Sequence, residues 1–411
     1  MANIELILIN ISGQDRPGVT SALTDILARY EAQILDIGQA DIHHSLSLGI
    51  LFKTDAERSG DILKDLLFKC YELNVKVRFS PVSIQDYENW VSRQGKNRWI
   101  ITILGRQLTA RHIALVTDEI ARQELNIDGI QRLTGRMPLN SDEEPRSKSC
   151  VEFSVRGNPV DVTAMRSQFL KISQSEDFDI SLQEDNVFRR CRRLICFDMD
   201  STLIETEVID ELADRAGVGD EVRAITESAM RGEIDFCESF KRRVALLKGL
   251  DESVMRDIAE HLPITEGVER MMQVLKRTGY KTAILSGGFT YFGNYLKQRF
   301  GFDYVYANEL EVENGKLTGR YVGDIVDGKR KAELLKIIAQ VENINIMQTI
   351  AVGDGANDLP MLSTAGLGIA FHAKPKVKQT ARQSISTIGL DGVLYFLGFK
   401  DSFITDAPAD E

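Results

Sequence analysis

The sequence predicts an α/β protein built in two halves. In the first half, short apolar stretches follow the order strand, helix, strand, strand, helix, strand, and this order occurs twice. In the second half, apolar strands alternate with long helices, which favours a doubly wound parallel sheet. A long helical stretch without strand pattern follows the first of these strands. It predicts a helical cap inserted into the sheet domain.

Length and composition limit the class of protein. A chain of 411 residues exceeds what one hydrophobic core usually serves, so we expect two or three domains. With 43% hydrophobic and 27% charged residues, the composition is typical of soluble globular proteins. The formal net charge of -11 disfavours nucleic acid and anionic membrane surfaces as partners, because both are negatively charged.

The N-terminal segment and the cysteines indicate the compartment. Residues 1–10 have no basic region before their apolar run, so they predict a strand rather than a signal peptide. No apolar run approaches the roughly 20 residues that a membrane helix needs. An odd number of cysteines without a C-x-x-C pair argues against a disulfide framework, so we expect a cytoplasmic protein. The five are Cys70, Cys150, Cys191, Cys196 and Cys237.

The first half is predicted to hold one βαββαβ domain over residues 1–82 and a second over 99–185. The first has predicted strands at 4–10, 34–42, 46–53 and 75–79 and helices at 18–30 and 61–73. The second has predicted strands at 99–104, 127–133, 151–155 and 178–182 and helices at 109–124 and 160–175. Residues 83–98, which are polar, predict a linker, and the Pro-containing stretch 135–149 predicts a mobile loop.

The two copies align at a constant offset, which indicates an internal duplication; the alternative is a chance match of apolar positions. The offset is 92 residues, and it pairs Gly13 with Gly105, Ala22 with Ala114, Leu23 with Leu115, Leu35 with Ile127, Asp36 with Asp128 and Gln39 with Gln131.

The turn from Gly13 to Thr20 contains a Pro-Gly pair between a strand and a helix. It resembles the turn of ACT domains, small ferredoxin-like modules that often bind amino acids at paired interfaces. The resemblance implies that Gly18 lets backbone amides bind the carboxylate of serine or a related amino-acid effector, and that chains pair as a homodimer. A tight turn without a ligand is the alternative. The second copy departs from this pattern, because it has Gly105 but no Pro-Gly pair. Gly105 is therefore the one residue there to which the resemblance extends the ligand site.

The second half opens with an apolar run, 194–197, that ends in Asp198 and Asp200. In an open parallel sheet, ligands bind beyond the carboxyl ends of the strands, so acids at a strand end predict a site. A solvated turn is the alternative. Because alternate positions on an extended chain point to the same side, the carboxylates of Asp198 and Asp200 are expected to face the same way. Residues 207–262 have a helical pattern and predict the cap.

Further strands end in matching groups. The strand 280–285 ends in Ser286 and Gly287, which can donate hydrogen bonds to a phosphate. Lys331 opens an amphipathic helix, and the strand 349–353 ends in Asp354, Asn357 and Asp358. Residues 309–318 predict a hairpin with a turn at Asn314-Gly315. Oxygen ligands gathered from separate elements predict a hard divalent cation.

These ordered motifs, Asp198-Met-Asp-Ser-Thr202, Ser286-Gly287, Lys331 and Gly353-Asp-Gly-Ala-Asn-Asp358, resemble those of the haloacid dehalogenase-like hydrolases. The resemblance covers about 194–398 and implies a phosphatase domain over 190–400, with the cap at about 208–265 and a tail at 401–411. It implies a nucleophile at Asp198, an acid and base at Asp200, and Mg²⁺ held by Asp198, the Asp200 carbonyl and Asp354. Lys331, Ser286, Gly287 and Asn357 would bind phosphate, and Asp358 would orient Lys331 or a metal-bound water.

The cap adds a narrower resemblance. Glu207, Phe236 and Arg243 are similar to cap residues of the phosphoserine phosphatase branch of that family, and with ACT-like modules in front the whole chain resembles bacterial members. The resemblance implies L-phosphoserine hydrolysis, the last step of serine biosynthesis. Glu207 would bind the substrate ammonium, Arg243 its carboxylate, and Phe236 would exclude water. Two alternatives remain: a phosphatase or phosphotransferase for another small metabolite, and a non-enzymatic amino-acid sensor.

Overall fold

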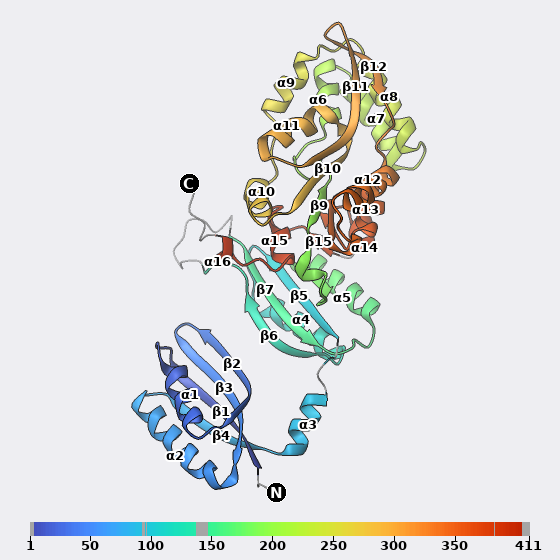
Figure 1. Ribbon diagram of the computed structural model, residues 1–411. Coiled ribbons are helices and arrows are strands. Elements are labelled where there is room, and N and C mark those ends of the chain that lie inside the picture. The colour runs from blue at the N-terminus through green and yellow to red at the C-terminus, as the bar shows by residue number, and fades with distance from the viewer. Residues whose placement is uncertain (1–3, 93–94, 96, 137–146, 382, 405–411) are drawn as a thin grey trace. The chain divides into compact units, whose positions relative to one another are not determined.

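The computed structural model describes residues 4–92, 95, 97–136, 147–381 and 383–404. Its contacts divide the chain into two compact units, Met1–Lys96 and Asn97–Glu411. The predicted fold class is confirmed: both βαββαβ modules and the doubly wound sheet with its helical cap are present. Figure 1 follows these elements along the chain from blue to red. No helix among the described residues is long and apolar enough to cross a membrane.

The first unit is a four-stranded antiparallel sheet in the order β2-β3-β1-β4 with two helices on one face. Alternate residues of β1, Ile7, Ile9 and Ile11, are buried beneath these helices, while Asn10 and Ser12 on the opposite face are exposed. The period-two pattern therefore places one face in the core. The elements are β1 Ile4–Gln14, α1 Val19–Arg29, β2 Gln33–Ile42, β3 Ser45–Asp55, α2 Ala56–Glu72 and β4 Lys76–Val82.

The predicted linker contains a helix, α3, spanning Ile84–Ser92. None of its residues is buried, so local interactions hold it. The hydroxyl of Ser83 accepts a hydrogen bond from the Asp86 amide at 3.0 Å and donates to the Asp86 carboxylate at 2.7 Å. This is the Ser-x-x-acid pattern that begins many helices.

The second unit begins with a sheet of the same topology, β6-β7-β5-β8. Its loop 135–149, predicted to be mobile, lies mostly outside the described residues, which omit 137–146. The elements are β5 Arg98–Gly105, α4 Ala110–Arg122, β6 Asn126–Arg132, β7 Ser149–Arg156, α5 Val162–Glu176 and β8 Asp179–Glu184.

This second module shares its core with the rest of the unit. Leu104 and Cys150, on the sheet face away from α4 and α5, join the apolar cluster that contains Val393 and Leu394. The side chain of Gln383 pairs with the backbone of Leu182, accepting from its amide at 3.1 Å and donating to its carbonyl at 2.7 Å. In the first copy the position equivalent to Leu104 is the exposed Ser12, so the two modules differ in the face they leave free.

The large sheet has seven strands in the order β12-β11-β10-β9-β13-β14-β15. β9 lies at its centre and pairs in parallel with β10 and β13. Both faces of β9 are covered: Ile195 and Phe197 pack in one apolar cluster with α10 and α11, and Leu194 and Cys196 pack in another with α12 and α13. This explains the uninterrupted apolar run. The strands are β9 Leu194–Phe197, β10 Lys281–Phe289, β11 Tyr304–Glu313, β12 Lys316–Val322, β13 Thr349–Gly353, β14 Leu367–Phe371 and β15 Gln383–Ile385.

The cap consists of four helices after β9, and Figure 1 shows them gathered at one end of the sheet beside the β11–β12 hairpin. The hairpin turns at Asn314 and Gly315, both at positive φ, as predicted. The predicted tail begins as the short helix α16, and residues 405–411 lie outside the described residues. The helices are α6 Val208–Ala216, α7 Gly219–Met230, α8 Phe236–Leu246, α9 Ser253–Glu260, α10 Val268–Arg277, α11 Thr290–Phe300, α12 Gly328–Val341, α13 Leu359–Thr364, α14 Pro375–Thr380, α15 Gly392–Phe396 and α16 Asp401–Ile404.

Candidate active site

Side chains from the carboxyl ends of neighbouring parallel strands meet at one edge of the large sheet. Asp198 follows β9, and its amide donates to the carbonyl of Val352 in β13 at 2.9 Å. Asp354 follows β13 directly. Parallel strands that pair in register end together, so acids about 150 residues apart in sequence become neighbours.

Lys331 links two of these acids. It lies in the first turn of α12, and its ammonium contacts Asp198 Oδ1 at 2.9 Å and Asp358 Oδ1 at 2.7 Å. Lys331 and Asp358 are fully buried and Asp198 is 5% exposed. Burial disfavours the ammonium charge, but the carboxylates of Asp198 and Asp358 outweigh this and raise the pKa of Lys331. A buried cation between two carboxylates neutralises an otherwise repulsive site.

Three carboxylates lie close enough to share a cation. Oxygens of Asp198, Asp354 and Asp358 lie within 4.8 Å of one another. Burial and the neighbouring Asp358 and Glu207 raise the pKa of Asp354 to about 7. Burial, followed by Asp358, also raises the pKa of Asp198 well above its usual value. Acids that are costly to ionise together form a site that fits a divalent cation with oxygen ligands.

Asp200 occupies a separate position next to the cluster. Its carboxylate accepts from the Val208 amide at 3.0 Å and from the Ser286 hydroxyl at 3.5 Å. Burial and the nearby Glu207 raise the pKa of Asp200 to about 8, which favours the protonated form of this carboxyl group compared with a free aspartate. The turn after Asp198 is tight: the amides of Thr202, Leu203 and Ile204 all donate to the carbonyl of Met199.

Ser286 and Gly287 belong to β10 itself, whose pairing with β11 is irregular between Leu285 and Phe289. The predicted strand therefore continues further than expected. Asn308 holds the irregular segment, because its side-chain amide donates to the carbonyls of Gly287 at 2.8 Å and of Gly288 at 3.3 Å. Asn308 was not predicted from the sequence, although a polar residue at the end of the apolar stretch 304–307 is a usable signal.

Gly288 is required by space. A side chain there would place its first carbon 2.3 Å from Asp200 Oδ2. A side chain at Gly287 would meet the Phe236 ring of the cap at 2.9 Å. The cap thus contacts the sheet directly over the predicted phosphate-binding segment.

The other predicted cap residues lie in the same region. Glu207 precedes α6 and accepts from the Ser201 hydroxyl at 2.9 Å. Arg243 in α8 contacts the Thr226 hydroxyl at 3.5 Å and the Ser239 carbonyl at 3.4 Å. Burial lowers the pKa of Arg243, and the negative charges of Glu207 and Asp210 partly oppose this effect. Arg243 therefore lies close enough to both acids to interact with their charges.

Asn357 is half-buried in the turn after β13, and its side-chain oxygen lies over Gly355, where an added carbon would meet it at 2.2 Å. The two module glycines differ. Gly18 caps α1 at φ +91 with nothing within 4 Å of an added carbon, whereas at Gly105 such a carbon would meet Phe178 at 3.2 Å. Gly105 is therefore explained by packing.

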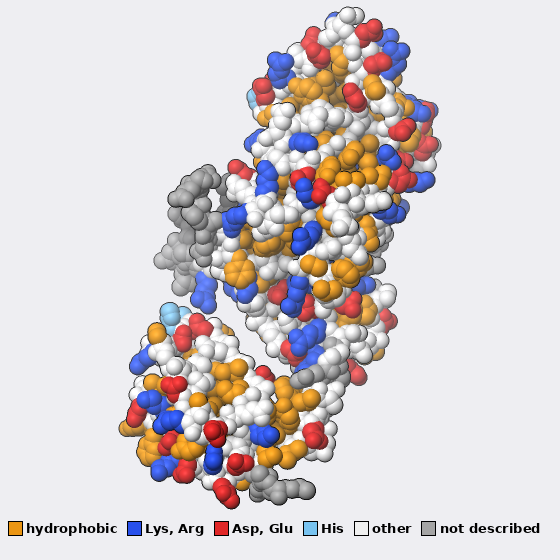
Figure 2. Space-filling model, viewed as in Figure 1, with side chains coloured by type: hydrophobic (Ala, Val, Ile, Leu, Met, Phe, Trp, Pro, Cys, Tyr) orange, Lys and Arg blue, Asp and Glu red, His pale blue; other side chains and the backbone are white. Residues whose placement is uncertain are grey.

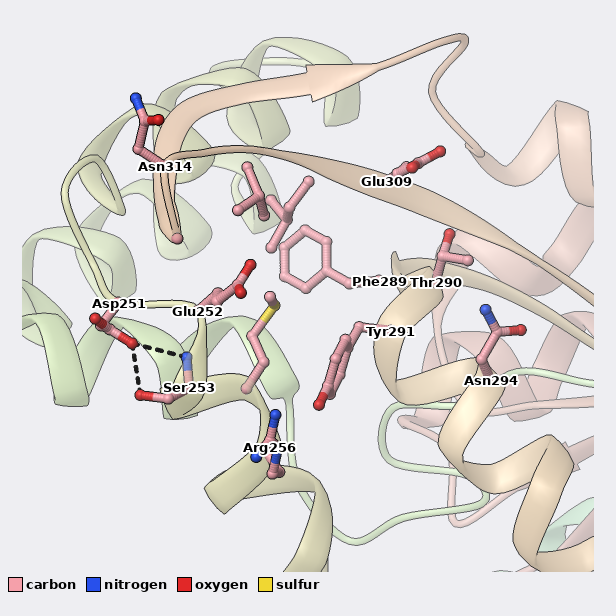
Figure 3. Close-up of a pocket in the computed structure, with 14 residues that line it drawn as sticks. Asp251, Glu252, Ser253, Arg256, Phe289, Thr290, Tyr291, Asn294, Glu309 and Asn314 are labelled. Atoms are coloured by element: carbon pink, nitrogen blue, oxygen red, sulfur yellow. Dashed lines mark hydrogen bonds between the residues drawn. The ribbon is translucent and has the colours of Figure 1, made fainter.

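A pocket of about 510 Å³ lies apart from these groups, between α9, the start of α11 and the β11–β12 hairpin. Figure 3 shows that its polar side chains come from the cap, the start of α11 and the hairpin. The Asp251 carboxylate accepts hydrogen bonds from the amide and the hydroxyl of Ser253. None of the site residues predicted from the sequence lines this pocket.

Sequence comparison identifies the class. The model of the haloacid dehalogenase-like hydrolases matches residues 195–363, and models of ACT domains match 5–80 and 98–183. A crystal structure of a haloacid dehalogenase family hydrolase from Salmonella enterica is similar with a TM-score of 0.63 at 29% identity, covering 75% of this chain and 99% of that chain. The fold and the acid-bearing strand ends are thus those of a haloacid dehalogenase-like hydrolase.

Full-length relatives narrow the assignment. The chain is 38% identical to a phosphoserine phosphatase of Streptomyces coelicolor, over 97% of this chain and 93% of the relative. It is 38% identical to phosphoserine phosphatase SerB2 of Mycobacterium tuberculosis, over 98% and 96%. A probable phosphoserine phosphatase from Vibrio cholerae has a TM-score of 0.56 at 35% identity, covering 74% of this chain and 87% of that chain. The chain belongs to the phosphoserine phosphatase family.

Proposed function

We propose that the protein hydrolyses L-phosphoserine to serine and phosphate through a phosphoaspartate at Asp198. The observation that carries the proposal is the buried array of Asp198, Lys331 and Asp358 beside Asp200, whose pKa is raised to about 8. An Asp198 oxygen forms a bond to phosphorus while the bond from phosphorus to the serine oxygen breaks, and Asp200 gives its proton to that oxygen. Water then attacks phosphorus, Asp200 takes a proton from it, and the bond to Asp198 breaks.

The residues around the array have distinct tasks. Lys331 holds Asp198 in place and neutralises the charge of the transferred group. Ser286 and the amides beside Gly287 bind phosphate oxygens, and Asn357 binds phosphate or serine. Asp358 keeps Lys331 in position, as their 2.7 Å contact supports.

The acid cluster suits Mg²⁺. The carboxylates of Asp198 and Asp354 and the Asp200 carbonyl would hold it. When bound, the ion supplies positive charge against which carboxylate and phosphate can approach. At about 100 times its Kd, a ligand of the native state adds about 2.7 kcal/mol to the free energy of unfolding. We therefore expect Mg²⁺ to raise the Tm of EDTA-treated protein, as measured by calorimetry.

Asp354→Asn should remove most of this Tm increase, and Asp324→Asn, an exposed aspartate in the loop before α12, should leave it intact. An unchanged Tm of the wild-type protein in saturating Mg²⁺ would contradict the metal site.

Substrate choice is assigned to the cap: Glu207 for the ammonium of phosphoserine, Arg243 for its carboxylate, and Phe236 for excluding water. The shared environment of Glu207 and Arg243 supports this. Arg243→Ala is expected to lower kcat/KM for phosphoserine about 100-fold, because a charged partner is lost from a desolvated site. Hydrolysis of p-nitrophenyl phosphate, which has no carboxylate, should stay within about twofold.

Steady-state phosphate release from a panel of phosphorylated amino acids and sugars tests both the function and this role. Arg242→Ala is the matched control, since Arg242 is exposed and pairs only with Glu238 among its described side-chain contacts. Equal activity on phosphorylated sugars would favour the alternative hypothesis of a phosphatase for another small metabolite. If no substrate is turned over more than once per chain, the protein is not a phosphatase, and the amino-acid sensor is favoured.

The first ACT module is assigned an amino-acid effector, such as serine, at the Gly18 turn. The turn is open, and no side chain caps the amides of α1. Titration calorimetry with L-serine is expected to show binding to the wild-type protein and to Gly60→Ala, a glycine of α2 that also faces open space, but not to Gly18→Ala. Chains are expected to pair through these modules, and sedimentation of a monomer would contradict that.

A further inference from the structure

Two hinge segments, Leu203–Glu205 and Pro263–Thr265, join the cap to the sheet domain. They pair with each other: the Glu205 amide donates to the Pro263 carbonyl at 2.9 Å, and the Thr265 amide donates to the Leu203 carbonyl at 3.1 Å. Ile204 and Ile264 form an antiparallel bridge between them. The first segment starts three residues after Asp200, and the second ends next to Glu266. The paired segments therefore form the covalent connection between the cap and the sheet domain.

The second ACT module contacts this place directly. Arg106, the first residue after β5, binds the Glu266 carboxylate with both guanidinium nitrogens, at 3.0 and 2.6 Å. Lys148, at the start of β7, lies 3.7 Å from the same carboxylate. Two cations from separate loops of the module therefore enclose Glu266.

The other side of this contact is fixed in the sheet domain. The Glu266 carbonyl accepts from the Leu390 amide at 2.7 Å. Asp391, which is fully buried, binds Lys148 at 2.6 Å and Arg270 at 2.7 Å. A carbon added at Gly267 would lie 2.3 Å from the Asp391 carboxylate, so the chain passes this point without room to shift.

A pocket lies beside the second hinge segment. Ile264, Thr265 and Glu266 line this pocket of about 490 Å³ together with residues of α10 and α11. The position of the segment therefore depends on its pairing with the first hinge segment and on the contacts with Arg106, Lys148 and the turn at Leu390.

We propose that Arg106 and Glu266 are positioning residues, through which the second ACT module sets the position of the cap over the catalytic groups. The inference rests on the proposed function and extends it to a specific contact. A displaced hinge moves Glu207 and Arg243 relative to Asp198 and Lys331, because Glu207 lies two residues beyond the first hinge segment. Recognition of phosphoserine then weakens while the phosphate-binding groups of the sheet domain keep their geometry.

Charge reversal tests the contact. Arg106→Glu and Glu266→Arg are each expected to raise the KM for phosphoserine about fivefold or more, with kcat changed less. The double variant should recover part of this loss, because the exchanged pair is restored while Lys148 still lies beside position 266. The KM for p-nitrophenyl phosphate, which does not use Glu207 or Arg243, should not change. Arg111→Glu is the matched control, because Arg111 makes an equally close pair with Glu176 inside the same module, at 2.8 and 2.6 Å.

Hydrogen exchange gives a readout that needs no substrate. In Arg106→Glu the amides of Glu205 and Thr265 should exchange about tenfold faster than in the wild type, and in Arg111→Glu they should exchange at the wild-type rate. In the double variant they should exchange more slowly than in Arg106→Glu. Wild-type exchange in a folded Arg106→Glu protein overturns the proposal, whether or not phosphoserine is hydrolysed. Faster exchange with an unchanged KM for phosphoserine also overturns it, since the hinge would then not position the cap.

Discussion

Asp198→Asn is expected to reduce phosphate release from phosphoserine by about 10⁴-fold or more while the protein still folds. An amide is a poor nucleophile, so the phosphoaspartate cannot form. Asparagine keeps the shape of the side chain. Its oxygen can still accept the hydrogen bond from the Met199 amide, which is 2.7 Å long in the wild-type protein. Steady-state phosphate assays and a Tm measurement by calorimetry check both halves of the expectation.

Stability should survive this change because Asp198 is costly to ionise where it lies. Burial and then Asp358 raise its pKa, so a neutral side chain relieves desolvation and repulsion even though it gives up the Lys331 contact. Asp161→Asn, a helix cap in the second module that keeps its acceptor, is the control and should retain full activity. Turnover by Asp198→Asn above about 1% of wild type would contradict a covalent role.

The meeting of the candidate catalytic groups could be predicted from the sequence because each follows a strong local pattern. Asp198 and Asp354 end apolar runs that can only be buried strands, and parallel strands end at one edge, so their meeting follows from the fold class. The hairpin turn at Asn314 and Gly315 was equally local. The roles of these residues and the identity of the cap residues came from family resemblance.

Contacts between distant segments were not predictable in this way. Nothing near Arg106 in the sequence indicates Glu266, 160 residues later, or that Lys148 reaches Asp391. Leu104 looked like any core residue of its strand, yet it marks the face by which the second module joins the sheet domain. Two local signals were also missed: Ser83 and Asp86 at the start of α3, and Asn308, which bonds to the predicted phosphate-binding segment.

Lys331→Met is expected to lower kcat about 10³-fold, because the fixed charge facing the transferred group is removed. Methionine has a similar length, so packing is largely kept. Removing one partner of a buried ion pair costs about 3–5 kcal/mol of stability, since Asp198 and Asp358 are left facing each other without a cation. Phosphate assays and calorimetry of metal-free protein measure the two effects.

The stability loss should depend on pH in a definite direction. Lys331 lowers the pKa of Asp198, so its removal raises that pKa further above the unfolded value. When folding raises the pKa of a carboxyl group, that group ionises more easily in the unfolded chain than in the folded protein. It therefore lowers the free energy of unfolding as the pH rises. The Tm difference from wild type should therefore widen as the pH rises above the pKa of Asp198 in the folded wild-type protein. Lys336→Met, on the exposed face of the same helix, should show neither effect. A kcat within about tenfold of wild type for Lys331→Met would contradict the assigned role.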